Sequence, residues 1–206
     1  MQKIIITSLA LAFLSTSAVA RDSYYGKGLI GFGYVPSQKA SNLTVPNNIK
    51  TKGRGAFGIL GIGYNFGNTN VRSDLEFYFD NGLRGKKNVN SQKLETMAGF
   101  LNFYYDFRSQ SKLTPFVMGG VGYAKNKYKF NDASYSYSKN KNGFAYKVGL
   151  GLAYKVMLSL DIEGSYFYMD KGAKKVTVSH SGGSTYHLKS SGSRVHAFAI
   201  GPRINF

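Results

Sequence analysis

The feature that most constrains the fold of this chain is a two-residue period in the placement of its apolar side chains. Between residues 71 and 80, Val, Ser, Leu, Phe and Phe alternate with Arg, Asp, Glu, Tyr and Asp. A helix would spread these charges around its axis, whereas a strand places all of them on one face. The alternation recurs over 101–106, 145–154 and 159–168, and weaker, glycine-rich versions cover 24–35, 54–65, 113–124 and 194–206. The sequence therefore predicts an all-β fold of eight strands.

The spacing of these segments predicts how they are connected. The connections at 66–70, 108–112 and 155–157 are short and suit tight hairpin turns. The connections at 37–53, 81–92, 125–142 and 170–192 are long and rich in Lys, Asn, Ser and Gly. In an antiparallel up-and-down meander, every short turn lies at one end and every long loop at the other. Both termini then join the end with the short turns.

Two all-β architectures fit this alternation. A soluble sandwich or lipocalin-like barrel turns its apolar face inward, whereas an outer-membrane barrel turns it toward lipid and fills its interior with polar side chains. Tyr and Phe gather near the strand ends, as in the aromatic girdles of membrane barrels. The polar face carries both signs of charge, as expected of a network inside a narrow tube: Arg72, Asp74, Glu76, Asp106, Lys147, Asp161, Glu163 and Arg203.

We therefore expect an eight-stranded antiparallel transmembrane β-barrel. Closure follows from the solvent, because an open sheet edge in hydrocarbon leaves backbone groups without hydrogen-bond partners. The first strand must then pair with the last.

The two ends of the chain predict export to the outer membrane of a bacterium. Residues 1–20 combine Lys3, an apolar run and the motif Ala18-Val19-Ala20, which is typical of a secretory signal peptide. We expect cleavage after Ala20, leaving residues 21–206 as one barrel domain with four long loops facing the exterior. Phe206 ends the last alternating strand, and a terminal strand of this form is commonly recognised in the assembly of outer-membrane barrels.

Several segments resemble the small opacity-type outer-membrane barrels. They are residues 61–64 (GIGY), 71–76 (VRSDLE), 102–107 (NFYYDF) and 114–123 (TPFVMGGVGY). The resemblance runs from the signal peptide through all eight predicted strands to Phe206, and the first two segments also resemble adhesins of rickettsia-like intracellular bacteria. It implies an eight-stranded barrel whose four surface loops contact host molecules.

The net charge of +17 is concentrated in the long connections. Segments 37–53, 81–93, 125–142 and 170–192 contribute +3, +4, +4 and +3. A cluster of one sign attracts acidic partners in a salt-dependent manner. We therefore expect the loops to bind host-cell surface proteins or sulfated glycans through basic residues, namely Lys50, Lys52, Arg84, Lys86, Lys87, Lys125, Lys127, Lys129, Lys139, Lys141, Lys171, Lys174 and Lys175.

An alternative interpretation of these basic residues stays open. The lysines can be solvated and neutralise outer-membrane lipid, including the phosphates of lipopolysaccharide, in a structural or small-pore protein without a host ligand. Nucleic acid does not fit the predicted compartment.

The sequence predicts no catalytic residue, cofactor or metal. Without cysteine, neither a disulfide nor a thiolate metal site can form. The glycine-rich stretches 28–33 and 58–63 lack the helix pattern that follows a dinucleotide-binding loop. His180, His187 and His196 do not have the spacing of metal ligands. A Ser–His pairing in segment 170–192 has only Asp170 to orient the histidine, so we expect no enzyme.

Overall fold

The computed structural model describes residues 23–40, 49–67, 69–87, 90–107, 111–132, 135–172, 176–179, 185–188 and 194–206. The predicted signal peptide and its cleavage site after Ala20 lie outside these residues. In the described part of the chain the regular elements are strands, and no helix has the length and apolar character to cross a bilayer.

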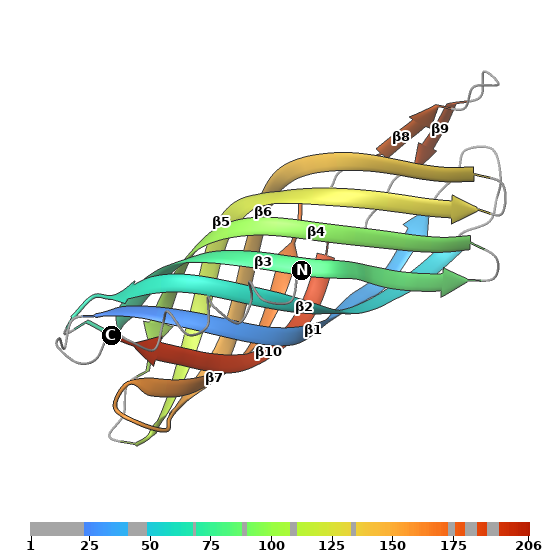
Figure 1. Ribbon diagram of the computed structural model, residues 1–206. Coiled ribbons are helices and arrows are strands. Elements are labelled where there is room, and N and C mark those ends of the chain that lie inside the picture. Colours follow the sequence, from blue (N-terminus) through green and yellow to red (C-terminus); the bar gives the residue numbers. More distant parts are fainter. Residues whose placement is uncertain are drawn as a thin grey trace, which may run out of the picture.

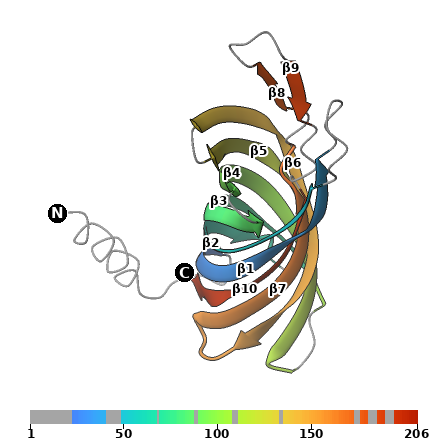
Figure 2. The same cartoon turned by 90° about the vertical axis from the view of Figure 1, so that its right-hand side faces the viewer.

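Eight antiparallel strands form a closed barrel (Figure 1; Figure 2). Around the barrel the order is β1, β10, β7, β6, β5, β4, β3 and β2, so the first strand closes against the last. β8 (Val176–Ser179) and β9 (Thr185–Leu188) form a separate two-stranded hairpin. The predicted fold class is confirmed. The barrel strands are β1 (Tyr24–Ala40), β2 (Ile49–Asn65), β3 (Val71–Lys87), β4 (Asn90–Asp106), β5 (Leu113–Asp132), β6 (Tyr135–Lys155), β7 (Leu160–Asp170) and β10 (Arg194–Asn205).

The short connections gather at one end of the barrel, which we call the short-turn end (Figure 1). In the turn between β2 and β3, the Phe66 N–H donates to the Val71 carbonyl, and Gly67 has a φ of 47°, a left-handed conformation that favours glycine. The Phe206 N–H donates to the Tyr24 carbonyl, which brings the C-terminus to the same end. The opposite end, with the long connections, is called the long-loop end below.

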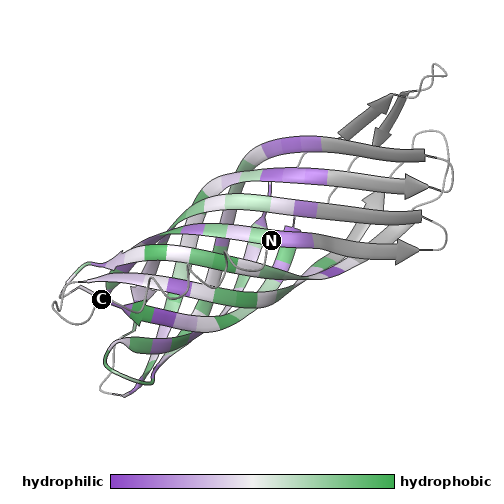
Figure 3. Ribbon diagram, in the orientation of Figure 1, coloured by the Kyte–Doolittle hydropathy of each residue, from purple (hydrophilic) through white to green (hydrophobic). Residues whose placement is uncertain are grey.

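The two-residue period separates an apolar outer wall from a mixed interior. In β3, Leu75 and Phe77 are exposed on the outside, whereas Asp74 and Glu76 between them are buried in the barrel. β7 shows the same alternation along its whole length. Apolar segments predominate between the short-turn end and the middle of the strands, and hydrophilic segments follow toward the long-loop end (Figure 3).

Glycines on the inner face make room for aromatic rings. A Cβ atom at Gly151 on β6 would overlap the ring of Phe116 on β5. A Cβ atom at Gly63 on β2 would likewise overlap the ring of Tyr25 on β1. The interior of an eight-stranded barrel is just wide enough for its own side chains, so each large ring needs a small neighbour.

The strands extend farther toward the long-loop end than the sequence predicted. β3 runs to Lys87 and β4 begins at Asn90, so most of segment 81–92, which we expected to be a loop, is a strand hairpin. Most of segment 125–142 is also strand. Segment 37–53 has strand at both ends, and segment 170–192 contains β8 and β9 in its interior. Polar residues end the apolar alternation, but they leave the backbone hydrogen bonds of an established antiparallel ladder intact.

Candidate functional site

The barrel interior contains a buried network of charged side chains from six strands. Its centre is Glu76 on β3, whose carboxylate accepts a hydrogen bond from Lys147 Nζ and lies 3.0 Å from Lys27 Nζ. Lys27 also lies 2.7 Å from Asp74 Oδ2. Asn102 Nδ2 donates to Asp74 Oδ1 at 2.5 Å, so the neighbouring carboxylates of β3 share cationic and amide partners.

A second group of ion pairs lies closer to the short-turn end. Arg72 Nε donates to Asp106 Oδ1 at 3.1 Å, and Arg72 Nη2 lies 3.3 Å from Glu163 Oε2. Arg203 donates to Asp161 at 2.8 Å and to Glu163 at 3.3 Å. The structure thus places all eight charges expected on the polar face inside the barrel, each with an ion-pair partner there.

Aromatic rings fill the space around these charges. The Arg72 guanidinium carbon lies 3.8 Å from the centroid of the Tyr104 ring and 4.8 Å from that of Phe116. Lys147 Nζ lies 5.0 Å from the centroid of Phe100 and 5.3 Å from that of Phe167. Cations in such positions are attracted to the ring faces as well as to the carboxylates. The interior is therefore packed with side chains.

Sequence reasoning missed Lys27 as a member of this network. The predicted set contains three cations and five carboxylates. This excess of negative charge was a signal that a further cation was needed. Lys27 lies between Tyr25 and Leu29 on the inner face of β1. The glycine-rich composition of that strand made its polar face hard to recognise.

Lys171 is a correction to the predicted partner-binding set. Instead of projecting from a loop, it is fully buried directly after β7, and its Nζ donates to Asp80 Oδ2 at 2.5 Å and to Thr96 Oγ1 at 3.1 Å. Asn126 Nδ2 donates to the Lys171 carbonyl at 3.1 Å, which fixes the backbone as well. Asp80 is a buried carboxylate that requires a cation, and Lys171 is the residue that supplies it.

This cluster lies at the end of the interior that faces the long loops. Tyr78 donates to Asp80 Oδ2 at 3.0 Å, and Thr96 donates to Asn126 Oδ1 at 3.0 Å, so β3, β4, β5 and the residue after β7 are joined. Burial lowers the pKa of the Lys171 ammonium group below its usual value, against the opposing effect of the Asp80 carboxylate. We call Tyr78, Asp80, Thr96, Asn126 and Lys171 the upper cluster.

The other predicted partner-binding residues lie mainly on strands and not in irregular loops. Lys125 and Lys127 are exposed on β5, and Lys141 on β6 is half-buried. Lys174 and Lys175 lie outside the described residues. The remaining seven are placed by the backbone alone, namely Lys50 and Lys52 on β2, Arg84, Lys86 and Lys87 on β3, Lys129 on β5 and Lys139 on β6.

The strand register brings cationic residues side by side beyond the apolar wall. Arg54 on β2 pairs with Arg84 on β3, Arg84 pairs with Lys93 on β4, and Lys93 pairs with Lys129 on β5. We call these four residues the cationic row. Neighbouring like charges repel one another, so such a row favours the binding of an anion.

The histidines do not form a metal site in the part of the chain that the structure describes. Within it, no group of three or more His, Asp or Glu side chains is arranged to hold a metal ion. His196 lies on the outer wall, where its Nδ1 is 2.7 Å from the Tyr166 hydroxyl. His187 lies on β9, and His180 falls outside the described residues.

A comparison with protein families decides what kind of barrel this is. The model of the outer membrane protein beta-barrel domain matches residues 6–197. The chain belongs to this family. Its relative PagN, an outer membrane protein of Salmonella typhimurium, is 28% identical over 92 residues, which make up 42% of this chain and 38% of PagN. The match therefore spans well under half of PagN.

Solved structures of outer-membrane proteins share the fold. OprG from Pseudomonas aeruginosa matches 90% of this chain and 96% of its own, with a TM-score of 0.63 and 17% identity. Neisserial surface protein A matches 92% of this chain and 100% of its own, with a TM-score of 0.58 and 15% identity. At these identities the likeness extends to the fold, and the more specific resemblance to rickettsial adhesins stays a prediction.

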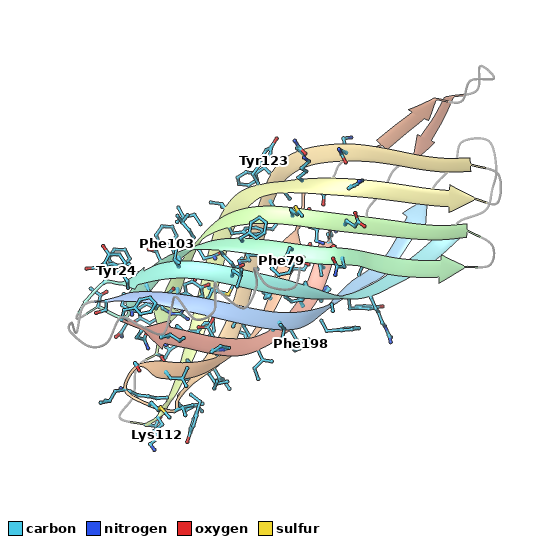
Figure 4. The ribbon with its side chains drawn as sticks, viewed as in Figure 1. Tyr24, Phe79, Phe103, Lys112, Tyr123 and Phe198 are labelled. Atoms are coloured by element: carbon cyan, nitrogen blue, oxygen red, sulfur yellow. The ribbon has the colours of Figure 1, made fainter. Side chains whose placement is uncertain are left out.

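Membership of the outer-membrane barrel family explains the apolar outer wall, because lipid covers that surface in a membrane. Exposed aromatic side chains lie toward both ends of the wall, among them Tyr24, Phe103 and Phe107 toward the short-turn end and Phe79 and Tyr123 toward the long-loop end. Several of them project outward in Figure 4. Their positions match the aromatic girdles of membrane barrels.

Proposed function

We propose that this protein is an adhesin-like surface barrel whose cationic long-loop end binds polyanionic molecules of a host, such as sulfated glycans or acidic cell-surface proteins. One observation carries the proposal. The interior cations Lys27, Arg72, Lys147, Lys171 and Arg203 are paired with carboxylates, whereas Lys125 and Lys127 are exposed beyond the apolar wall. These two exposed lysines, unlike the interior cations, are therefore free of the barrel interior and support binding of an acidic partner.

The proposed orientation places the long-loop end outside the cell and the short-turn end in the periplasm, after removal of the signal peptide at Ala20. The distribution of charge supports it, because the long connections contribute most of the net charge of +17. Compact turns at the opposite end, such as the one at Gly67, offer little surface to a ligand.

The proposed binding is electrostatic with an aromatic contribution. Cations on one surface raise the local concentration of an acidic partner and accelerate its encounter, and salt weakens both effects. The hairpin of β5 and β6 adds aromatic residues near its tip, where Phe130 pairs with Tyr137 and Tyr128 pairs with Lys139. Aromatic side chains supply contact area at a low cost in conformational entropy.

Heparin provides a direct test on the full mature chain refolded in detergent. We expect the chain to bind immobilised heparin, and the double variant Lys125→Gln/Lys127→Gln to bind about tenfold more weakly, which corresponds to about 1.4 kcal/mol. A matched control is Lys112→Gln/Lys155→Gln, which removes two exposed lysines at the short-turn end. This control should bind like the unmodified chain.

Two results would contradict the proposal. Equal weakening by both double variants would mean that the affinity for heparin depends on the net charge of the chain alone. Equal binding of heparin and desulfated heparin would mean that the sulfate groups are not recognised. Because the attraction is screened by ions, the advantage of the unmodified chain should also shrink between low and high salt.

A structural barrel without a host ligand is the second candidate, and the packed interior favours it over a pore. Arg72 lies among the rings of Tyr104 and Phe116, and the upper cluster occupies the interior toward the long-loop end. We expect the unmodified chain to produce no discrete conductance steps in planar bilayers. Stable steps would instead support a small-pore protein.

A further inference from the structure

The turn between β6 and β7 presents an apolar tip at the short-turn end (Figure 1). Val156, Met157 and Leu158 follow one another in this turn, and their exposed fractions are 45%, 64% and 91%. Lys155, an exposed cation, separates them from Tyr154, the last aromatic residue on the outer wall of β6. The tip therefore extends past the aromatic girdle and into water.

Backbone hydrogen bonds hold this turn in one conformation. The N–H groups of Val156 and Met157 both donate to the Leu160 carbonyl, at 2.9 and 3.1 Å, and the Leu160 N–H donates to the Met157 carbonyl at 3.4 Å. The Ser159 carbonyl accepts a hydrogen bond from the Asn205 N–H at 2.8 Å, which ties the turn to the last strand. Because these bonds join backbone groups, the turn does not depend on the chemistry of the Met157 side chain.

The other methionines in the described part of the chain lie in different surroundings. Met118 on β5 and Met169 on β7 are inside the barrel, with exposed fractions of 7% and 0%. Met97 on β4 is exposed, but it lies on the apolar outer wall, which lipid covers in a membrane. Among the methionines that the structure describes, Met157 is thus the one whose sulfur is open to water.

We propose that Met157 is a reversible oxidation site, where hydrogen peroxide or another oxidant that transfers one oxygen atom converts the thioether to methionine sulfoxide. With peroxide, the sulfur lone pair forms an S–O bond while the O–O bond breaks. The departing hydroxide takes the proton of the transferred oxygen and leaves as water, so sulfur loses two electrons and peroxide gains them. The inference goes beyond host binding, since it concerns a chemical modification at the opposite end of the barrel.

The position of Met157 allows this change without loss of the fold. A sulfoxide is polar, whereas a thioether behaves as a flexible apolar group. Inside the barrel, a sulfoxide at Met118 or Met169 would place a new polar oxygen in a packed interior, which is costly unless the oxygen is hydrogen-bonded. At Met157 water solvates the oxygen, and an enzyme that reduces methionine sulfoxide can reach it. Oxidation therefore converts an apolar tip into a polar one on a barrel that stays intact.

Peptide mapping of the full mature chain, refolded into phospholipid vesicles and treated with hydrogen peroxide, tests the site. Trypsin cleavage after Lys155 and Lys171 releases residues 156–171, a single peptide that contains both Met157 and Met169. Tandem mass spectrometry then compares an exposed and a buried thioether at equal recovery. We expect Met157 to be oxidised at least about tenfold faster than Met169, because oxidation follows exposure. In urea the two rates should become equal.

Met157→Leu is the matched control, because it keeps an apolar side chain of similar size without sulfur. This variant should lose the fast oxidation and keep the heat-dependent gel shift. A mixture of the two classes of methionine sulfoxide reductase, one for each sulfoxide epimer, should restore Met157 in the folded, oxidised chain.

Three results would overturn the proposal. Equal oxidation of Met157 and Met169 in the folded chain, or faster oxidation of Met97 in vesicles, would show that Met157 is not a selective site. Loss of the gel shift as Met157 is oxidised would show that the fold does not tolerate the sulfoxide. Failure of both reductases to act on the folded chain would show that the modification is not reversible.

Discussion

Lys147 on β6 reaches across the barrel interior and donates a hydrogen bond to Glu76 on β3. The second carboxylate oxygen of Glu76 lies 3.0 Å from Lys27 Nζ on β1. These three strands are not neighbours around the barrel. One buried carboxylate therefore links distant parts of the wall. Its loss would leave the buried Lys147 ammonium without its ion-pair partner.

The substitution Glu76→Gln should lower the free energy of unfolding by about 3–5 kcal/mol, because it leaves the Lys147 ammonium buried without its carboxylate. Lys27 is affected less, since it retains Asp74 at 2.7 Å. Urea unfolding in detergent micelles, followed by the heat-dependent gel shift and circular dichroism, measures the loss. Lys112→Gln, an exposed control in a turn, should change stability by less than about 0.5 kcal/mol.

Removing the Lys147 charge as well should restore part of this stability. In Glu76→Gln/Lys147→Met the apolar side chain fits between the rings of Phe100 and Phe167, and no uncompensated ammonium remains. We expect a coupling energy of at least about 1 kcal/mol in the double-mutant cycle. Strict additivity of the two single substitutions would contradict a direct ion pair.

Gly151→Ala should lower the free energy of unfolding by about 1–3 kcal/mol, because the added methyl group overlaps the Phe116 ring and forces the packed interior to shift. Gly119→Ala on the paired strand β5 is the matched control, since its methyl group would enter open space on the outer wall. The same unfolding assay compares them. A control that loses as much stability as Gly151→Ala would attribute the effect to the β-strand backbone and not to ring packing.

Alkaline pH should reveal the buried ammonium of Lys171. Because its pKa is lowered in the folded state, the unfolded chain binds more protons just below the usual lysine value, and folding becomes more favourable as pH rises there. Just below the usual lysine pKa of about 10.4, the unfolding free energy of the unmodified chain should therefore rise with pH relative to that of Lys171→Met. Parallel pH profiles for the two proteins would contradict burial of this lysine.

The strand pattern and the interior charges could be predicted because both depend on local alternation. A buried residue such as Glu76 lies between outward apolar residues, and this period is visible without any tertiary information. The pairing of β1 with β10 followed from the need to satisfy backbone groups in lipid. The family match and the closed barrel confirm the outer-membrane barrel fold.

The remaining features depend on contacts that the alternation does not encode. Lys171 follows the last residue of β7, where the sequence resembles a solvated basic loop, and only the position of Asp80 across the barrel explains its burial. The pairing of Arg54 with Arg84 in the cationic row depends on the strand register and on the register irregularity between Arg54 and Phe57.

Lipid should contact Leu150 and not Lys127. The chain contains no cysteine, so Leu150→Cys and Lys127→Cys each provide one labelling site. Leu150 is exposed on the apolar wall of β6, whereas Lys127 lies beyond it on β5. In vesicles containing lipids brominated in their acyl chains, a fluorophore at 150 should be quenched strongly and one at 127 weakly. The reverse order would place the apolar wall away from lipid.

The proposed orientation places Lys127 outside the cell and Lys112 in the periplasm. Lys127 is exposed toward the long-loop end, and Lys112 is exposed in the turn between β4 and β5 (Figure 4). A membrane-impermeant maleimide should therefore label Lys127→Cys on intact cells, because that position is in contact with the medium. Lys112→Cys should react only after the outer membrane is permeabilised, and its labelling then controls for expression and thiol reactivity. Labelling of Lys112→Cys alone on intact cells would invert the barrel, and it would move the excess positive charge to the side where no host molecule can reach it.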